Sequence, residues 1–298
     1  MVTVLDEEIS FNNLGITLPH EHLTIDLSAL KNDEDAKLSR ERVEKSLKKA
    51  KKYGVETLID LTNIGMGRDI LTIKKIRDKL NINIMASTGF YKEPFLPEWT
   101  VKKSVDELAQ IMIDDIEKGI DDTDLKASVI GEIGSGREFT DLEKKIFKAA
   151  AAAQKQTNCP LITHLTLGKL GLEQIDFLLK QGVDLSQVVL SHVSLSDDLD
   201  YILELAKSGV FLGLDTIGKL QYQSNEFRLK LIDSLMEAGY SGQILLSMDI
   251  TRNSQIDQYG YQYLFEKFIP QLKSIGLNQT NINKLLIDNP KKLFCNYT

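Results

Sequence analysis

The amino-acid sequence predicts an α/β fold of the (β/α)8 or TIM-barrel type, in one domain that spans residues 1–298. Two observations lead to this prediction. Eight short runs that contain apolar and β-branched residues alternate with helical patterns, which is typical of β/α units around a parallel sheet. The chain has 298 residues, 42% of them hydrophobic, and this length suits one closed barrel.

The eight predicted strands follow one another without an intervening linker or low-complexity segment. Each run is short enough for a buried strand, and a segment with helical periodicity follows it. In chain order the predicted strands cover residues 16–22, 55–61, 82–88, 128–133, 161–165, 188–192, 210–215 and 244–249.

Start signals precede several of the predicted helices. Thr140 and Glu143 form a capping-box pattern, and Ser196 and Ser224 each stand before acidic or amide residues. The lysine-rich residues 42–52 contain a glutamate and spaced apolar positions, which indicates the solvated face of an amphipathic helix. A last helical segment, residues 280–294, is expected to pack under the barrel and close it.

Three other architectures or chemistries fit the sequence less well. An open doubly wound sheet would carry a glycine-rich phosphate turn after its first strand, where this chain has PHEHL. The later GEIGSGR segment lacks the Lys-Ser/Thr of a P-loop, so we interpret it as a tight strand-to-helix loop. No G-x-S-x-G motif occurs that would indicate a serine nucleophile.

The sequence places metal-binding residue types at the ends of five predicted strands, where barrels carry their active sites. His20 and His22 lie two apart, so both can point to the same side of a strand. Imidazole and carboxylate ligands suit zinc, with manganese, cobalt or iron as alternatives. The six candidates are enough for two divalent ions, and a single-ion site is the alternative: His20, His22, Glu132, His164, His192 and Asp249.

Six motifs follow the same order and spacing as in a known family: PHEHL, GEIG, ITHLT, LSHVSLSDDLDYI, LDTIGK and LSMDITR. Over nearly the whole chain the sequence resembles the phosphotriesterase-like branch of the amidohydrolase superfamily. The resemblance implies a barrel of the metal-dependent hydrolase type with a binuclear centre.

The resemblance also implies a role for each ligand. His20, His22 and Asp249 would bind the more buried ion, and His164 and His192 the more exposed one. Many relatives bridge the two ions with a carboxylated lysine, whereas this chain has Glu132 at that position. A glutamate offers the same O–C–O group with a shorter reach, so we expect a small shift of the strand backbone or the ions.

The activity expected from the resemblance is hydrolysis of a lactone or carboxylic ester by a hydroxide that bridges the two ions. Asp249 would take the proton of the attacking hydroxide and deliver it to the leaving oxygen. Two alternatives remain open. One is a phosphoester, phosphotriester or amide hydrolase with the same centre, and the other is a catalytically silent metal-binding protein.

Four residues in the loops after the strands are candidate substrate contacts: Tyr91, Arg137, Lys219 and Arg252. Because three of them are cations, the expected substrate is a small anionic molecule. The alternative is that each cation pairs with a nearby carboxylate, such as Asp215 or Asp257. Asp60 is expected to be a buried supporting acid rather than a metal ligand.

Composition limits the partners. A formal net charge of −7 offers no attraction for nucleic acid or anionic lipid. The N-terminus lacks a signal-peptide pattern and no apolar run approaches a membrane span, so we expect a soluble, cytoplasmic protein. The two cysteines, Cys159 and Cys295, are expected to be reduced. The resemblance further suggests a homodimer.

Overall fold

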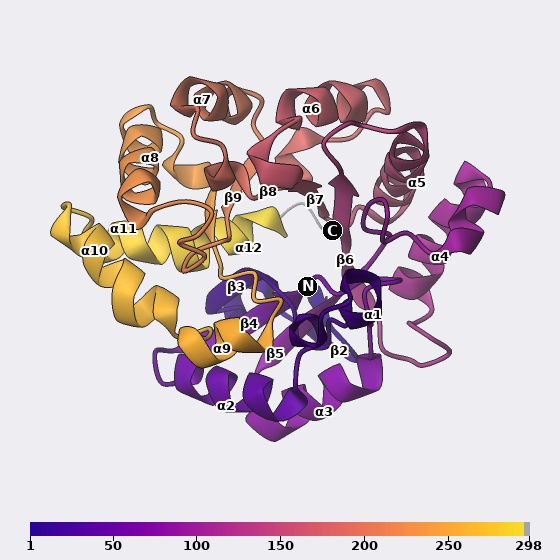
Figure 1. Ribbon diagram of the computed structural model, residues 1–298, viewed down its shortest axis with the longest axis horizontal. Helices are drawn as coiled ribbons and strands as arrows, with labels where there is room; N and C mark the ends of the chain where they lie inside the picture. Colours follow the sequence, from indigo (N-terminus) through magenta and orange to yellow (C-terminus); the bar gives the residue numbers. More distant parts are fainter. Residues whose placement is uncertain (295–298) are drawn as a thin grey trace.

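A computed structural model describes residues 1–294 of the chain. Eight parallel strands, β3 to β10, form a nearly closed barrel with helices around it (Figure 1). Each strand pairs with the next in chain order, which confirms the predicted (β/α)8 fold. A short antiparallel hairpin precedes the barrel. The strands are β1 (Val2–Val4), β2 (Glu7–Ile9), β3 (Ile16–Glu21), β4 (Val55–Asp60), β5 (Asn83–Thr88), β6 (Ala127–Ser135), β7 (Leu161–Leu165), β8 (Val188–Ser191), β9 (Phe211–Leu214) and β10 (Ile244–Leu246).

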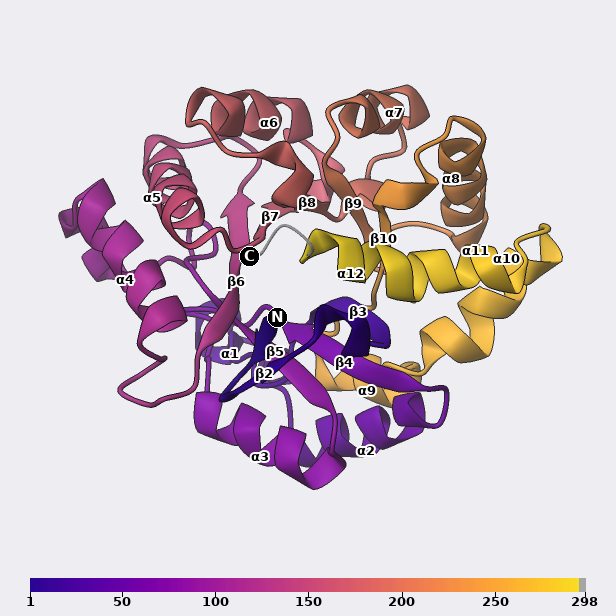
Figure 2. The same cartoon turned by 180° about the vertical axis from the view of Figure 1, so that it is seen from behind.

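The α-helices lie outside the strands, apart from the last ones, which cross one end of the barrel (Figures 1 and 2). They are α1 (Ser28–Lys31), α2 (Arg40–Lys51), α3 (Ile70–Leu80), α4 (Val105–Glu117), α5 (Asp141–Thr157), α6 (Gly171–Lys180), α7 (Leu199–Lys207), α8 (Asn225–Glu237), α9 (Asn253–Gln258), α10 (Ile269–Ser274), α11 (Gln279–Asn283) and α12 (Asn289–Leu293).

The helix start signals have different outcomes. Thr140 and Ser224 cap α5 and α8 as predicted, and the capping box of Thr140 is complete. The prediction for Ser196 was wrong by two residues. Asp198 caps α7, while the Ser196 hydroxyl accepts a hydrogen bond from the Asp198 backbone N–H. An aspartate nearer the helix satisfies its first turn directly, and the serine stabilises the turn before it.

Apolar residues of the strands alternate between two layers, as the period of two requires. Ile162 of β7 and Val189 of β8 belong to a small cluster inside the barrel. Leu161 and Leu165 of β7 belong to the larger cluster that packs the strands against the helices. This alternation directs His164, two residues beyond Ile162, to the inside of the barrel.

The barrel closes between its first and last strands through residues that also hold the candidate site. The Asp249 backbone N–H donates to the His20 carbonyl oxygen at 3.2 Å. The Ser247 hydroxyl accepts from the His20 backbone N–H at 3.1 Å and donates to Glu21 Oε1 at 2.7 Å. The two ends of the sheet are therefore joined next to two candidate ligands.

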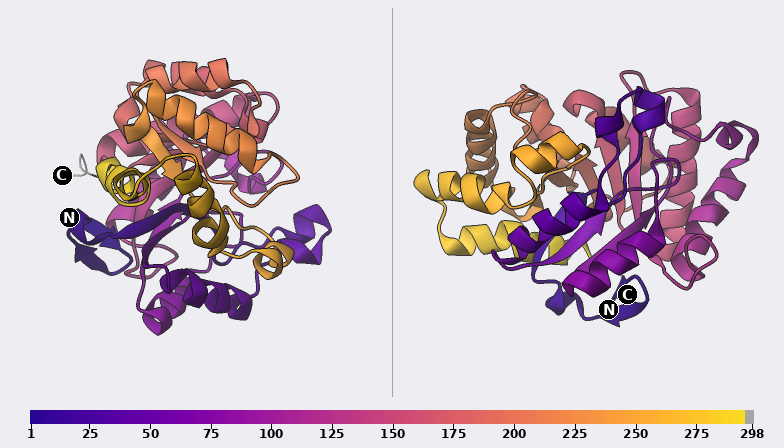
Figure 3. Two further views of the ribbon diagram at one scale, coloured as in Figure 1. Left: turned by 90° about the vertical axis from the view of Figure 1, so that its left-hand side faces the viewer. Right: turned by 60° about the horizontal axis from the view of Figure 1, so that its bottom comes forward.

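The opposite end of the barrel is covered by both ends of the described chain (Figures 2 and 3). Leu293 and Phe294, at the end of the helical segment α11 to α12, pack with Val2, Val4 and Leu14 in the inner cluster. The segment thus closes the barrel at its N-terminal face, as predicted. Cys159 is buried, and Cys295 lies outside the described residues.

Strand β6 contains a bulge that the sequence did not reveal. The register with β7 shifts between Ile130 and Ile133, which both face the outer layer although they are three residues apart. The extra residue lets Glu132 point into the barrel. The interpretation of GEIGSGR as a loop was therefore partly wrong, because β6 continues through Ser135.

Two further observations concern the lysine-rich segment and the character of the helices. Helix α2 buries Val43 and Leu47 and contains most of the lysine-rich residues 42–52, in agreement with an amphipathic helix. Within residues 1–294, no helix has both the length and the apolar character that a membrane crossing requires.

Glu143, at the start of α5, links two loops at the C-terminal ends of the strands. Its Oε1 accepts from the backbone N–H groups of Gly136 at 3.0 Å and Glu93 at 3.3 Å, and its Oε2 accepts from Thr140 N at 3.2 Å. The carboxylate is 1% exposed. It therefore fixes the loops that follow β5 and β6.

We predict that Glu143→Gln lowers the free energy of unfolding by about 1–2 kcal/mol, because an amide N–H would face backbone N–H groups. Glu107→Gln is the matched control, since Glu107 occupies the same position in the capping box of the exposed start of α4. Urea denaturation measures both. An equal loss of stability in the two variants would contradict the role given to Glu143.

Candidate metal centre

The six predicted ligands converge at the C-terminal end of the barrel, although they come from five strands. His20 and Glu132 lie within β3 and β6, and His164 lies in β7. The other three follow strands: His22 comes directly after β3, His192 directly after β8 and Asp249 three residues after β10. All six residues are at most 9% exposed.

The first group consists of His20, His22 and Asp249. His22 Nε2 lies 3.4 Å from Asp249 Oδ1, and His20 Nε2 lies 3.8 Å from the same oxygen. These separations place three ligand atoms around one point deep in the barrel.

The second group consists of Glu132, His164 and His192. His164 Nδ1 lies 2.9 Å from Glu132 Oε2 and 2.8 Å from His192 Nε2. Glu132 also reaches the first group, because its Oε1 lies 3.7 Å from His22 Nε2. Its Oε2 lies 3.6 Å from His20 Nε2 as well, so the Glu132 carboxylate stands between the two groups, where a bridging ligand is needed.

Hydrogen bonds at the other ring nitrogen orient three of the imidazoles. Asp215, at the end of β9, contacts His192 Nδ1 at 2.7 Å and His20 Nδ1 at 3.1 Å. The Thr62 hydroxyl lies 3.1 Å from His22 Nδ1. A bond at Nδ1 leaves Nε2 to face the centre and fixes the plane of the ring.

The backbone at two ligands departs from the strand conformation. His192 and Asp249 have φ angles of +65° and +48°, in the left-handed region that non-glycine residues seldom adopt. By alternation His192 should face outward with Leu190, which packs in the outer layer. The left-handed backbone turns the imidazole of His192 back to the centre, so the backbone is strained at the metal site.

The two carboxylates and His164 have the charges that cation binding needs, whereas His20 and His192 do not. Burial opposes protonation of these two rings, but Asp215 outweighs it, so the pKa of His20 is raised and that of His192 is raised to about 10. Burial raises the pKa of Glu132, but the imidazole of His164 and its neighbours reverse the effect and hold this pKa well below its usual range. Burial opposes ionisation of Asp249 in the same way, and the Lys219 ammonium outweighs it, so the pKa of Asp249 is lowered. Burial lowers the pKa of His164 to about 3. Ionised carboxylates and a neutral imidazole are the forms that bind divalent metals.

Two buried nitrogens test whether a metal fits. His20 Nε2 and His22 Nε2 are buried, and neither has a hydrogen-bond partner within the described part of the chain. Both face the carboxylates of Glu132 and Asp249 at distances too long for hydrogen bonds. Lone pairs held in this way fit a divalent ion bound by nitrogen and oxygen ligands.

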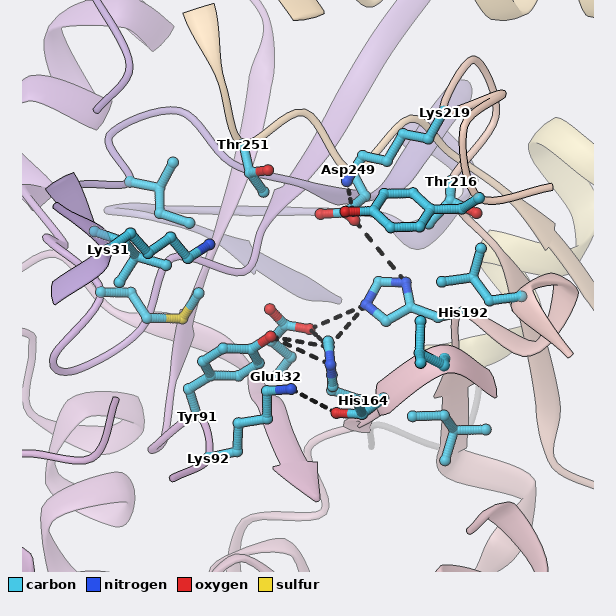
Figure 4. A pocket seen from close by; sticks show the side chains of 18 residues that line it. Lys31, Tyr91, Lys92, Glu132, His164, His192, Thr216, Lys219, Asp249 and Thr251 are labelled. Carbon is cyan, nitrogen blue, oxygen red and sulfur yellow. Dashed lines mark hydrogen bonds and ion pairs between the residues drawn. The ribbon is translucent and has the colours of Figure 1, made fainter. Parts of the chain in front are cut away.

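A cavity of about 200 Å³ opens onto the centre (Figure 4). Four of the six ligands line it, whereas His20 and His22 lie beneath, so the first group is the deeper one. One side is apolar, with Ile25, Leu27 and Met66. The other lining groups are cationic, aromatic, hydroxyl or aliphatic: Lys31, Lys92, Lys219, Tyr91, Tyr222, Thr166, Thr216, Thr251, Leu165, Leu167 and Leu195.

Of the four predicted substrate contacts, Tyr91 and Lys219 line this cavity. The Tyr91 hydroxyl lies 3.2 Å from His164 Nε2, and the Lys219 ammonium pairs with Asp249. Arg137 is exposed and does not line the cavity. Arg252 does not line it either.

Arg252 instead pairs with a carboxylate, as the alternative interpretation held, but with a different one. It contacts Asp33 in the loop between α1 and α2, rather than Asp215 or Asp257. The same loop is joined to the segment after β10 by Ser254, which donates its backbone N–H to Asp35 at 2.9 Å. Arg252 thus holds the loop that follows Lys31, the last residue of α1, which lines the cavity.

Sequence reasoning missed Asp215, Lys31 and Lys92 as site residues. Asp215 follows an apolar run, a signal comparable to that of Asp249, and could have been considered with the ligands. Lys31 and Lys92 carry no such signal, because they lie in the segments after β3 and β5, whose course the sequence does not determine. Asp60 accepts from the backbone N–H groups of Thr62 and Leu23 and is not grouped with the ligands.

An eight-stranded barrel with clustered histidines and carboxylates at the C-terminal strand ends is the arrangement of a metal-dependent hydrolase. The comparison with known proteins agrees. The sequence profile of the phosphotriesterase family matches residues 2–294, and the chain belongs to this family. Members are hydrolases with a binuclear divalent metal centre.

Three similar proteins cover nearly the whole chain. The phosphotriesterase homology protein of Escherichia coli (strain K12) is 42% identical over 96% of this chain and 100% of its own. Its crystal structure, with phosphate in the active site, has a TM-score of 0.92 and covers 95% and 99% of the two chains. An aryldialkylphosphatase of Saccharolobus solfataricus is 33% identical over 97% of each chain. A lactonase structure from Listeria monocytogenes is 25% identical over 98% of each chain, with a TM-score of 0.93.

We predict that Asp215→Asn weakens zinc binding by about 10- to 100-fold, because Asp215 orients two of the imidazoles. Titration against a chromogenic chelator measures the affinity. Asp200→Asn, on the exposed side of α7, is the control and should leave the affinity unchanged. Wild-type affinity in Asp215→Asn would show that the ring contacts of this carboxylate are not needed.

Proposed function

We propose that the protein hydrolyses a lactone or carboxylic ester that carries a phosphate or carboxylate group. One observation supports this proposal most: the cavity above the metal centre contains three lysines, Lys31, Lys92 and Lys219, beside an apolar wall. A small, partly apolar substrate with an anionic group matches such a lining.

The metal would serve the chemistry directly. Divalent ions held by His20, His22, Glu132, His164, His192 and Asp249 would lower the pKa of water and polarise the oxygen of the bond under attack. Zinc is our first choice because imidazole and carboxylate ligands suit it, and manganese, cobalt and iron remain alternatives.

The residues of the chain would then orient the substrate and move the proton. Asp249 is ionised, faces both the deeper histidines and the cavity, and is held by the Lys219 ammonium. We propose that it accepts the proton of the attacking water and returns it to the leaving oxygen. The Tyr91 hydroxyl, beside His164, can donate a hydrogen bond to a substrate oxygen.

The lysines differ in how available they are for an anion. Lys31 has no ion pair with a carboxylate in the structure of residues 1–294, and its ammonium lies 5.5 Å from the ring centre of Phe95. Burial lowers the pKa of Lys31. Water screens charges poorly at such a buried site, so an anion there would interact strongly with the Lys31 ammonium. The phosphate in the active site of the E. coli relative supports an anion in the active site of this protein.

A second candidate function is hydrolysis of a phosphotriester, which the similarity to an aryldialkylphosphatase favours. The cationic lining argues against it as the main activity, because a phosphotriester carries no charge for the lysines to bind. A catalytically silent metal-binding protein is less well supported, since metal binding alone does not require a cavity lined by three lysines.

We predict that a zinc-loaded preparation cleaves lactones with a phosphate or carboxylate group at least about tenfold more efficiently than neutral counterparts, which corresponds to one charge-assisted contact. The measurement is kcat/KM over a panel that also contains a phosphotriester and an N-acyl compound. Chelation should abolish the activity and zinc should restore it. Preference for the phosphotriester, or no activity on the panel, would contradict the proposal.

We also predict that Asp249→Asn lowers kcat by about 10²- to 10⁴-fold while the protein stays folded, because an amide cannot accept the proton. Steady-state kinetics and thermal unfolding test the two parts. Asp176→Asn, on the exposed face of α6, serves as the control for loss of a negative charge. Unchanged turnover in Asp249→Asn would refute the proton-transfer role.

A further inference from the structure

Arg228, the fourth residue of α8, is buried in a setting that is unfavourable for a cation. It is 0% exposed and is the largest side chain with so little exposure within residues 1–294. No carboxylate of the described chain lies within ion-pair distance of its guanidinium. It also stands in the first turn of a helix, where the macrodipole disfavours positive charge.

The contacts of Arg228 explain why the chain tolerates it there. Its Nη2 donates to the Thr216 carbonyl oxygen at 2.8 Å, and its Nη1 donates to the Gln223 carbonyl oxygen at 2.6 Å. These carbonyls belong to the two ends of the loop between β9 and α8. One guanidinium therefore spans the loop and joins its ends through two nitrogens held in a rigid planar fork, a geometry that a single ammonium does not reproduce.

The loop that Arg228 spans forms part of the substrate cavity. Thr216, Lys219 and Tyr222 line the cavity from this loop. Between its ends the backbone makes tight turns, with Lys219 N bonded to the Thr216 oxygen at 3.1 Å and Tyr222 N to the Lys219 oxygen at 3.0 Å. Tyr222 is 56% exposed, so the outer part of the loop has little packing to hold it.

Close packing at the inner part of the loop depends on a glycine. Gly218 has φ of +94°, and a Cβ there would lie 3.1 Å from the Met248 methyl carbon and 3.2 Å from the Tyr259 ring. The loop thus fits against the segment that leads to Asp249, and the Lys219 ammonium pairs with that carboxylate. A shift of the loop would therefore move Lys219 relative to the metal centre.

We propose that Arg228 is a positioning residue for substrate selection: it holds the loop of residues 216–223 so that Lys219 and Tyr222 face the cavity. A leucine or methionine would fill the same space without the cost of burying a charge, so the guanidinium is retained for its bonds to the loop. The effect on substrates rests on the proposed function, whereas the effect on the loop does not.

The test compares Arg228→Met and Arg228→Lys with the wild type, all loaded with zinc. Lys230→Met, two residues away on the exposed side of α8, is the matched control for loss of a positive charge. Two readouts are recorded: kcat and KM for an anionic lactone and its neutral analogue, and hydrogen exchange of peptides that cover residues 216–223.

In Arg228→Met we expect KM for the anionic lactone to rise about tenfold or more, as loss of buried charge-assisted hydrogen bonds implies. KM for the neutral analogue should change much less. Hydrogen exchange should increase in residues 216–223 and not in β9. Arg228→Lys should restore part of both effects, and Lys230→Met should match the wild type.

Wild-type kinetics and exchange in Arg228→Met would overturn the proposal, and so would equal losses for both substrates together with faster exchange throughout β9 and α8. If Arg228→Met does not fold, Arg228→Lys decides: faster exchange confined to residues 216–223 supports the proposal, and wild-type exchange there overturns it. If the wild type cleaves no anionic lactone, the proposed function fails, and the exchange readout alone decides the role of Arg228.

Discussion

The structure depends on one electrostatic constraint, which is that four imidazoles and two carboxylates are buried together at one end of a barrel. Such groups are costly to remove from water unless each has a partner of the right kind. The protein supplies partners on the outer side of the rings, where Asp215 and Thr62 contact the Nδ1 atoms of His192, His20 and His22. On the inner side the Nε2 atoms of His20 and His22 lack any partner among residues 1–294, and a divalent cation would provide it.

The contacts that stabilise the closed barrel also position the metal ligands. The barrel closes through Ser247 and the backbone of Asp249 at His20, so the same contacts join the sheet and place ligands. Glu143 and Arg228 lie further from the metal centre, and each forms hydrogen bonds with backbone groups of loops that border the cavity. The rigid strands thus position the metal ligands, while buried polar side chains position the substrate loops.

The sequence predicted the barrel, and it named six candidate ligands that the fold brings together, because both depend on local patterns. The His-x-His pair and the histidines at the ends of apolar runs mark the C-terminal ends of strands. The barrel then brings these strand ends together. Other features depend on geometry that a pattern does not contain. The bulge in β6 that turns Glu132 inward, the left-handed backbone at His192 and the pairing of Arg252 with Asp33 each result from packing between distant segments. Lys31 reaches the cavity for the same reason.

The most direct test is the metal content of the purified protein after saturation with zinc and removal of the excess, measured by elemental analysis. The account predicts two zinc ions per chain in the wild type and one in a variant that combines His164→Ala with His192→Ala, because the deeper group keeps its three ligands. A wild type without tightly bound zinc, or a double variant that still binds two ions, would contradict it.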